Sequence, residues 1–317
     1  NCHTYCNRNP DRSLFHARAD FGGTFFIDGK EIEKLNTKTD STISALVYPY
    51  WHPSGKYVAF SVNATRQSFF NHDPNRIEVF DTASDVVVYD VESHNVFWSP
   101  LTRSSQMFQT FPTFSPDGKW LYLCGCSPVG NMPDGYAEAH YGIYRIAFNP
   151  EDKTFGDSLE CLYDGEAEGK SASFPRISPD GRYLAFIKHG YGNFSIWHKD
   201  ADLWVIDLSD GALHSLTTAN SDDVDSYHSW SGNSRWLVFS SRRDDGLYTR
   251  PYITHIDENG NESKPFMLPQ RNPRRFYKDL MVSYNLPEFM EGPVRVSPHR
   301  ISTVMRKGKA TDVTPGQ

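Results

Sequence analysis

The stretch Phe111–Cys124, FPTFSPDGKWLYLC, recurs almost unchanged at Phe174–Ile187 as FPRISPDGRYLAFI. Related stretches begin at Tyr48 (YPYWHPSGKYVAFS), at Tyr227 (YHSWSGNSRWLVFS) and, in a fainter form, at Asn7 (NRNPDRSLFHA). The copies stand 43, 63, 63 and 53 residues apart when their turn residues are aligned, namely Pro10, Pro53, Pro116, Pro179 and Gly232. Recurrence at this spacing predicts a repeat architecture.

Each copy has the composition of two strands joined by a tight turn. Pro-Asp-Gly supplies the turn, because proline presets φ, aspartate bonds nearby backbone and glycine tolerates positive φ. In the segment that follows Pro116, Trp120, Tyr122 and Cys124 alternate with Leu121 and Leu123. Both faces of this strand are therefore apolar, which indicates a strand buried on two sides.

Two further short apolar runs follow the turn in every copy, so one repeat predicts four antiparallel strands. Such a sheet hides both faces only by stacking on its neighbours, which is the arrangement of a β-propeller blade. We therefore expect one all-β propeller domain over residues 1–317, closing as five or six blades. The five repeats lie near residues 7–36, 48–98, 111–163, 174–216 and 227–268.

Residues 269–317 are predicted to form an irregular or helical tail. The spacing of Phe276, Leu280, Met281 and Tyr284 suggests a helix over Pro273–Tyr284. The stretch Glu291–Met305, EGPVRVSPHRISTVM, is an alternative candidate for a degenerate sixth copy.

The motifs FSPDGKWLYL, ISPDGRYLAF and WHPSGKYVAF resemble the blade motif of TolB-like propellers, relatives of the WD-type repeats, over about residues 7–268. The stretches NCHTY, FSIWHKDADLW and YNLPEFMEGPV further resemble an envelope subgroup labelled cytochrome c biogenesis-like. This resemblance implies a periplasmic or outer-membrane-associated protein. The chain starts at Asn1 with no apolar leader, so we expect a signal peptide to have been removed.

Charge and composition limit the classes of partner that the protein is expected to bind. The formal charge is −7 and the sequence has no basic stripe, which argues against nucleic acid. No run of eighteen apolar residues suggests a membrane span. We expect the partner to be an envelope protein or another envelope component. Cys161 is predicted to be a small buried hydrophobic residue.

The pair Cys2–His3 matches the end of the haem-attachment motif Cys-x-x-Cys-His, in which thiols bond the haem and the histidine ligates the iron. The resemblance implies that Cys2 is the second thioether cysteine and His3 the proximal ligand. His16 is a candidate distal ligand, with packing inside a strand as the alternative. Covalent haem c requires a cysteine two positions before Asn1.

Two further groups of residues are candidates for ligand or partner binding. His198, Asp200 and Asp202 alternate, so on a strand they would share one face; they could hold a metal ion or only bond a blade loop. The run Arg242, Arg243, Asp244 and Asp245 follows a second strand, where it either bridges blades or forms a polar rim. His228 and Trp230 lie on the first strand of their repeat, expected to be nearest the axis.

Three functions stay open at this point. The leading hypothesis is a non-enzymatic envelope scaffold that binds a protein or ligand, with long loops at Ala64–Ser84 and Ser127–Tyr141 as binding surfaces. The first alternative is a haem-bearing electron-transfer protein. The second is a metal-dependent lyase or hydrolase acting on acidic oligosaccharides, with His52, His189 and His228 as candidate ligands. Whether the protein is an enzyme stays uncertain, with the balance against it, because no intact catalytic motif is present in the sequence.

Overall fold

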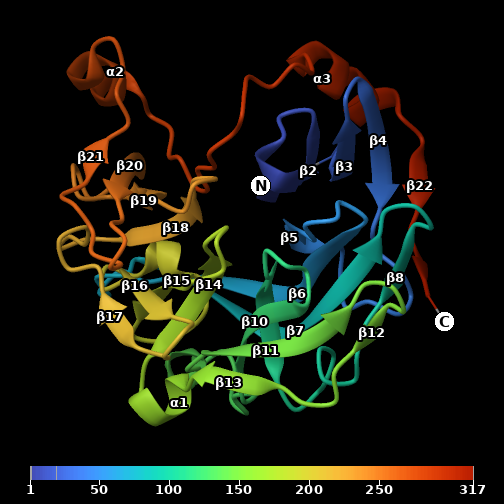
Figure 1. The fold of residues 1–317 in the computed structure, drawn as a ribbon, viewed down its shortest axis with the longest axis horizontal. Helices are drawn as coiled ribbons and strands as arrows, with labels where there is room; N and C mark the ends of the chain where they lie inside the picture. Colours follow the sequence, from blue (N-terminus) through green and yellow to red (C-terminus); the bar gives the residue numbers. More distant parts are fainter. Residues whose placement is uncertain (1, 19, 317) are drawn as a thin grey trace.

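The computed structural model describes residues 2–18 and 20–316. These residues form five sheets that are grouped around a common centre (Figure 1). The first sheet contains β1 (Cys2–Tyr5), β2 (Arg12–Ala17), β3 (Gly23–Asp28) and β4 (Glu31–Asn36). The second contains β5 (Val47–Trp51), β6 (Tyr57–Phe69), β7 (Ile77–Asp90) and β8 (Asn95–Phe97).

The third sheet contains β9 (Phe108–Phe114), β10 (Trp120–Cys126) and β11 (Gly142–Asn149), with β12 (Thr154–Phe155) and β13 (Glu160–Tyr163) both paired to β11. After the short helix α1 (Gly165–Glu168), the fourth contains β14 (Ser171–Ile177), β15 (Tyr183–His189), β16 (Asp202–Asp207) and β17 (Leu213–Ser215). The fifth contains β18 (Asp225–Trp230), β19 (Trp236–Ser241), β20 (Arg250–His255) and β21 (Phe266–Met267).

The five sequence repeats therefore correspond to five antiparallel sheets, and the all-β prediction is confirmed. Leu121 and Tyr122 point to opposite faces of β10 and are 0% and 2% exposed, as the two-sided apolar pattern required. One core cluster joins Ala59 and Val88 of the second sheet to Leu121 and Ile146 of the third. Neighbouring sheets thus bury each other's faces. Closure of the full ring as five or six blades stays a prediction.

The repeated turns explain why the motif is so similar in each copy. Asp117 accepts hydrogen bonds from the Ser115 hydroxyl and from the Lys119 amide, at 2.5 and 3.0 Å. Gly118 has a φ of +73°, a conformation that favours glycine. These contacts fix the reversal between β9 and β10.

The residues after the fifth sheet do not form a sixth one. The stretch Glu291–Met305 is an extended segment followed by α3 (Pro298–Lys307). Beyond α3, β22 (Ala310–Asp312) pairs in parallel with β4, and β23 (Thr314–Pro315) pairs in parallel with β8. The prediction of a degenerate sixth copy is therefore wrong, and the C-terminal tail instead borders the outer strands of the first two sheets.

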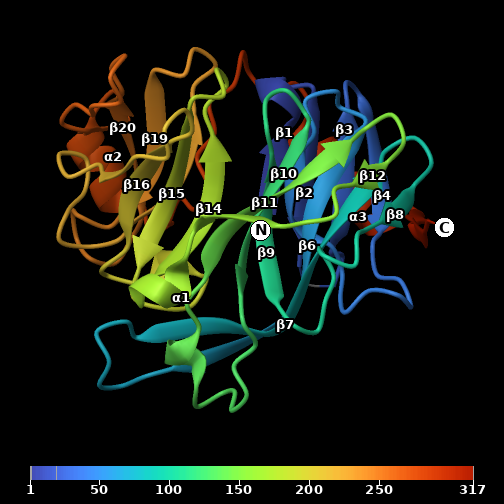
Figure 2. The same cartoon turned by 60° about the horizontal axis from the view of Figure 1, so that its bottom comes forward.

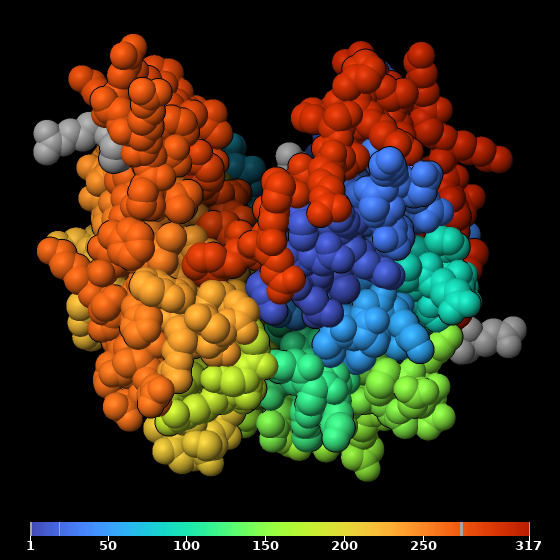
Figure 3. Space-filling model, turned by 45° about the horizontal axis from the view of Figure 1, so that its top comes forward, coloured from blue at the N-terminus to red at the C-terminus, as the bar shows by residue number. Residues whose placement is uncertain are grey.

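The predicted helix over Pro273–Tyr284 is shorter than expected: α2 covers only Pro273–Asp279. Arg250 donates hydrogen bonds to the carbonyls of Tyr277, Leu280 and Val282, and these bonds hold the chain in an extended path after α2. We call residues 280–291 the strap. It leaves the fifth sheet and reaches the first, and Figure 3 shows the molecule hollowed between these two sheets where the strap crosses.

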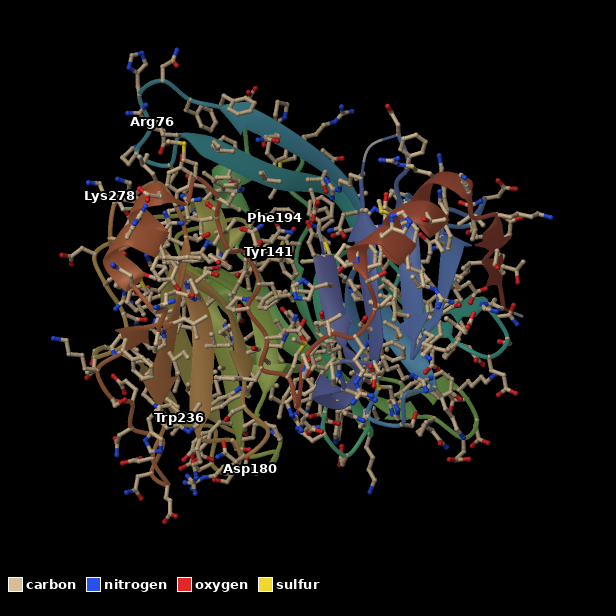
Figure 4. All side chains as sticks on the ribbon, turned by 90° about the horizontal axis from the view of Figure 1, so that it is seen from above. Arg76, Tyr141, Asp180, Phe194, Trp236 and Lys278 are labelled. Atoms are coloured by element: carbon tan, nitrogen blue, oxygen red, sulfur yellow. The ribbon has the colours of Figure 1, made fainter. Side chains whose placement is uncertain are left out.

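The expected loop Ala64–Ser84 is mostly a paired hairpin rather than a loop. β6 and β7 remain in register from Tyr57 opposite Asp90 to Phe69 opposite Ile77, with one irregularity at Ala64. We call residues 64–82 the arm. In Figure 4 the arm lies across one end of the ring, with Phe194 beneath it and Asp180 and Trp236 at the opposite end. Figure 2 shows that the arm, the far end of β6 and β7, projects beyond the rest of the second sheet.

Among the helices of the described residues, none has the length and apolar character needed to span a bilayer.

Candidate functional site: two cavities on the axis

The inner strands of four sheets carry an aromatic residue with positive φ, between +42° and +58°, at the same position of the repeat: Tyr48, Phe111, Phe174 and Tyr227. In each case the pairing with the next strand shifts register beside this residue, which marks a bulge. Successive rings contact one another, with centroid separations of 4.9, 5.7 and 4.9 Å. We call these four residues the collar.

On each inner strand, the residue two positions after the collar position belongs to a second layer of side chains. The register pairs His3 with Phe15, Tyr50 with Ala59, Thr113 with Tyr122, Arg176 with Ala185 and Ser229 with Val238, so the first members are equivalent in the five sheets. The strap adds Glu288 to the same region. Five sheets and the strap therefore meet in one mixed polar layer.

A cavity of about 260 Å³ opens on the arm side of this layer, and we call it the arm-side cavity. Tyr48, Phe174 and Tyr227 of the collar line it, and Thr65, Gln67 and Val79 bring in the arm. Cys2, His3 and Arg18 contribute from the first sheet. Phe194 and Trp197 complete its aromatic wall. The cavity therefore has an aromatic wall, with polar and aliphatic residues beside it and a thiol and an arginine from the first sheet.

A second cavity of about 100 Å³ opens toward the repeated turns, and we call it the turn-side cavity. It is lined by His3, Arg8, Arg176 and Glu288 among the ionisable residues, and by Trp51 and Trp230 among the aromatic ones. His3, Arg176 and Leu286 line both cavities. The two spaces are thus neighbours that share three side chains.

The strap closes the gap between the fifth and the first sheet through Glu288. Its Oε1 lies 3.3 Å from His3 Nε2, and its Oε2 accepts a hydrogen bond from the Tyr5 amide at 3.4 Å. Burial raises the pKa of Glu288 to about 7, against the opposing effects of that hydrogen bond and of Arg176. Burial also lowers the pKa of His3. A carboxyl group that titrates near neutrality therefore stands in the polar layer.

The arm is held down by buried polar contacts. Glu78 Oε2 lies 3.0 Å from His198 Nε2, and the two side chains are 1% and 0% exposed. Asp81 accepts hydrogen bonds from the amides of Asn63 and Asn193, at 2.6 and 2.7 Å. Burial raises the pKa of Asp81 to about 6. The arm is therefore a fixed wall of the arm-side cavity.

The structure does not bring His198 together with Asp200 and Asp202. His198 lies before β16, just after the 3₁₀ turn η3 (Ser195–Trp197), and points to Glu78. Asp200 is half-exposed and lies 3.8 Å from Lys170. Asp202 begins β16, and burial raises its pKa to about 6. Across residues 2–18 and 20–316, no three or more His, Cys, Asp or Glu side chains are grouped to hold a metal ion.

The run from Arg242 to Asp245 follows β19, as predicted, and its members separate. Arg243 donates to Asp225 of its own sheet at 2.7 Å and to the Ala219 carbonyl. Arg242 lies 4.9 Å from the Trp197 ring, near the arm-side cavity. Asp244 and Asp245 instead line a surface depression beside α2. The run therefore does not form one rim at the axis.

His228 and Trp230 both lie on β18, the inner strand of their sheet, as expected. Trp230 lines the turn-side cavity. His228 is fully buried without a hydrogen-bond partner for its ring, and burial lowers its pKa to about 3. The other two histidines of the lyase alternative lie elsewhere: His52 bonds the Gly118 carbonyl, and His189 is buried 4.8 Å from His198.

The three haem candidates lie in two different environments. Cys2 and His3 both line the arm-side cavity. His16 lies opposite Cys2 on β2, with its Nδ1 3.0 Å from the Thr24 hydroxyl, and it lines neither cavity. Burial lowers the pKa of His16 to about 4. Its position is that of a histidine packed within a strand.

Arg176 and Glu288 are the axial residues that sequence reasoning missed. Arg176 could have been found, because alignment of the repeats at their turn residues places it level with Tyr50, Thr113 and Ser229. Glu288 carried no such signal, since the strap belongs to no repeat.

Comparison with known proteins supports the fold. No family model matches the chain, and no curated protein matches it either. Among solved structures, an oligogalacturonate lyase in complex with manganese is similar with a TM-score of 0.52 at 11% identity, over 85% of this chain and 65% of the lyase. TolB from Acinetobacter baumannii is similar with a TM-score of 0.49 at 16% identity, over 84% of this chain and 57% of TolB.

A puromycin-hydrolyzing peptidase of Mycobacterium tuberculosis is also similar, with a TM-score of 0.47 at 13% identity, over 83% of this chain and 37% of the peptidase. The chain thus spans less than two thirds of each of these structures. At such low identity the likeness to the lyase bears on the fold alone. The chain therefore has a β-propeller fold of the kind predicted from its repeats.

Proposed function

We propose that this chain is a non-enzymatic propeller of the cell envelope that binds an envelope component in the arm-side cavity. One observation carries the proposal: inner strands of several sheets, the arm and the strap all converge on a single aromatic cavity on the axis. Pockets with an aromatic wall and a few polar groups are typical ligand sites. The envelope location rests on the resemblance of the repeats to TolB-like propellers.

The test places a bulky side chain in the arm-side cavity without replacing a buried residue. Gln67 is exposed on the arm and lines the arm-side cavity, whereas Arg66 points to the other face of the same strand. We expect Gln67→Trp to abolish capture of a specific component from envelope extract by the full-length protein, and Arg66→Trp to leave it unchanged. Equal capture by both variants contradicts the proposal, as does the absence of any specific capture by the unmodified protein.

Covalent haem c is a second candidate function, and one observation favours it. Cys2 and His3 are adjacent in β1 and both line the arm-side cavity, which also contains Arg18 and Arg176 as cations for propionate groups. Of the residues present, Cys2 would form one thioether and His3 would offer its imidazole, whose Nε2 would have to leave Glu288. The haem would supply one-electron transfer.

This second function is tested on the full-length protein by the pyridine haemochrome spectrum and by the reactivity of Cys2. A haem signal together with a Cys2 thiol that resists alkylation after unfolding supports it. A freely alkylated Cys2 eliminates it and leaves the scaffold proposal intact. The metal-dependent lyase or hydrolase stays a prediction, and no contact described above favours it.

A further inference from the structure

Arg176 is a buried cation whose donors are mostly unused by the protein. The residue is 8% exposed and lines both axial cavities. In the described part of the chain its single hydrogen bond runs from Nη1 to the Pro175 carbonyl, at 2.7 Å, and it forms no ion pair. A guanidinium has five N–H donors, and a buried charge is costly without a partner. Burial lowers its pKa to about 10, so it stays charged at neutral pH.

Aromatic rings hold this guanidinium in place. Its central carbon lies 3.7 Å from the ring centroid of Phe174 and 4.7 Å from that of Tyr50. Such contacts use the flat faces of the group, whereas its N–H donors lie in the plane. A fixed planar fork is the arrangement that recognises a carboxylate through two parallel hydrogen bonds.

The turn-side cavity also has the charge that an anion requires. Arg8 lines it, and the Nε of this residue is buried without a hydrogen bond, 3.9 Å from Glu291. The acidic group inside the cavity is Glu288, and its raised pKa leaves it about half protonated at neutral pH. Because Arg8 is paired with Glu291, Arg176 is the guanidinium of this cavity that has no carboxylate partner, and it stands near the carboxyl group of Glu288.

The remaining walls suit an apolar body. The indole N–H of Trp51 is donated to the Thr4 carbonyl, and that of Trp230 to the Arg176 carbonyl, at 3.3 and 3.0 Å. Because these donors are already used, both rings offer mainly apolar surface to the cavity. Leu286 and Phe289 of the strap add to it.

We propose that the turn-side cavity is a binding site for a small organic carboxylate. Arg176 binds the carboxylate group, and Trp51 and Trp230 contact the body of the ligand. This site opens on the turn side of the polar layer. It shares Arg176 with the arm-side cavity, so it requires that no anion bound on the arm side occupies this guanidinium.

Titration calorimetry on the full chain tests this with benzoate and its neutral isostere benzamide. We expect benzoate to bind at least about tenfold more tightly than benzamide, since a bidentate charged pair is worth more than a neutral contact. Arg176→Met should abolish the preference, whereas Arg235→Met should retain it, because Arg235 pairs with the exposed Glu258 away from the cavity. Equal binding of the two compounds, no binding of benzoate, or tighter binding of inorganic phosphate overturns the proposal.

Two further readouts need no disruption of Arg176. Fluorine NMR of protein labelled with 5-fluorotryptophan should show benzoate shifting the signals of Trp51 and Trp230 among the 7 tryptophans. Glu288→Gln should strengthen benzoate binding at pH 8, where Glu288 is ionised, and change it little at pH 5.5. Near this carboxyl group His3 and Tyr5 approach from β1, Arg176 from β14, and the pair Arg8 and Glu291 from the neighbouring turn and the strap. Shifts confined to other tryptophans place the ligand elsewhere and contradict the site.

Discussion

Arg250 should control whether the strap stays in place. This residue is 2% exposed on β20 and donates to the carbonyls of Tyr277, Leu280 and Val282, at 3.0, 3.0 and 2.8 Å. Arg250→Met keeps much of the apolar stem and removes all three charged donors. Hydrogen bonds from a charged group contribute about 1.5–3 kcal/mol each when the partner is left buried.

The expected loss is smaller than the sum of three such bonds. Val282 is exposed, so its carbonyl can bond water once the strap moves, while the bond from Arg250 to the Tyr277 carbonyl is buried. We therefore expect about 3 kcal/mol, taken mainly from local closure of the strap. This energy corresponds to roughly 100-fold faster amide exchange over residues 280–291.

Hydrogen–deuterium exchange measured by mass spectrometry checks this expectation. The amide of Tyr284, bonded to the Thr249 carbonyl, and that of Glu291, bonded to the Arg8 carbonyl, should lose protection, whereas β15 should not. Arg275→Met is the control, because Arg275 is 83% exposed and its ion pair with Asp279 is worth little. Unchanged exchange of the strap in Arg250→Met would refute the role given to these hydrogen bonds.

Three other perturbations have defined outcomes in denaturant unfolding. The pKa of Glu288 is raised from 4.5 to about 7, so between these pH values the folded state binds more protons than the unfolded state. The contribution of this group to the free energy of unfolding therefore falls by about 3 kcal/mol from pH 4.5 to 7. Glu288→Gln should reduce the difference in the free energy of unfolding between pH 5 and 7.5. Phe111→Ala should cost about 3–5 kcal/mol, because its ring is 1% exposed in the collar, while Phe69→Ala, 74% exposed, should cost under about 0.5 kcal/mol. Glu78→Leu leaves the buried His198 ring without its carboxylate partner and should cost about 3 kcal/mol, against under about 0.5 kcal/mol for the exposed Glu92→Leu. Equal losses in either matched pair would contradict the packing described.

The repeats made the sheets predictable because each copy combines two local signals. The turn chemistry around Asp117 and Gly118 fixes a reversal, and the apolar residues on both faces of β10 require neighbours on both sides. These signals are local in sequence, so they can be found without knowing the long-range contacts. The equivalence of Arg176 with Tyr50, Thr113 and Ser229 follows from the same alignment, whereas that of His3 is visible only in the strand pairing.

The arm and the strap could not be predicted, since long-range contacts decide both. Polar residues along 64–82 are typical of a loop, but Glu78 and Asp81 contact buried partners in the connection between β15 and β16 and so hold an extended hairpin. The end of α2 depends on Arg250, which lies more than twenty residues earlier. Cys161 was expected to be buried, yet it is exposed on β13, because that strand is at an outer position of its sheet.

The most direct test of the axial binding site uses two native thiols. Cys2 lines the arm-side cavity, while Cys161 is exposed on β13, away from the axis. Alkylation of both thiols is measured by peptide mass spectrometry on full-length protein, alone and with envelope extract. Our account predicts that the extract slows alkylation of Cys2 at least about tenfold and leaves Cys161 unchanged. Equal rates for Cys2 with and without the extract would contradict it.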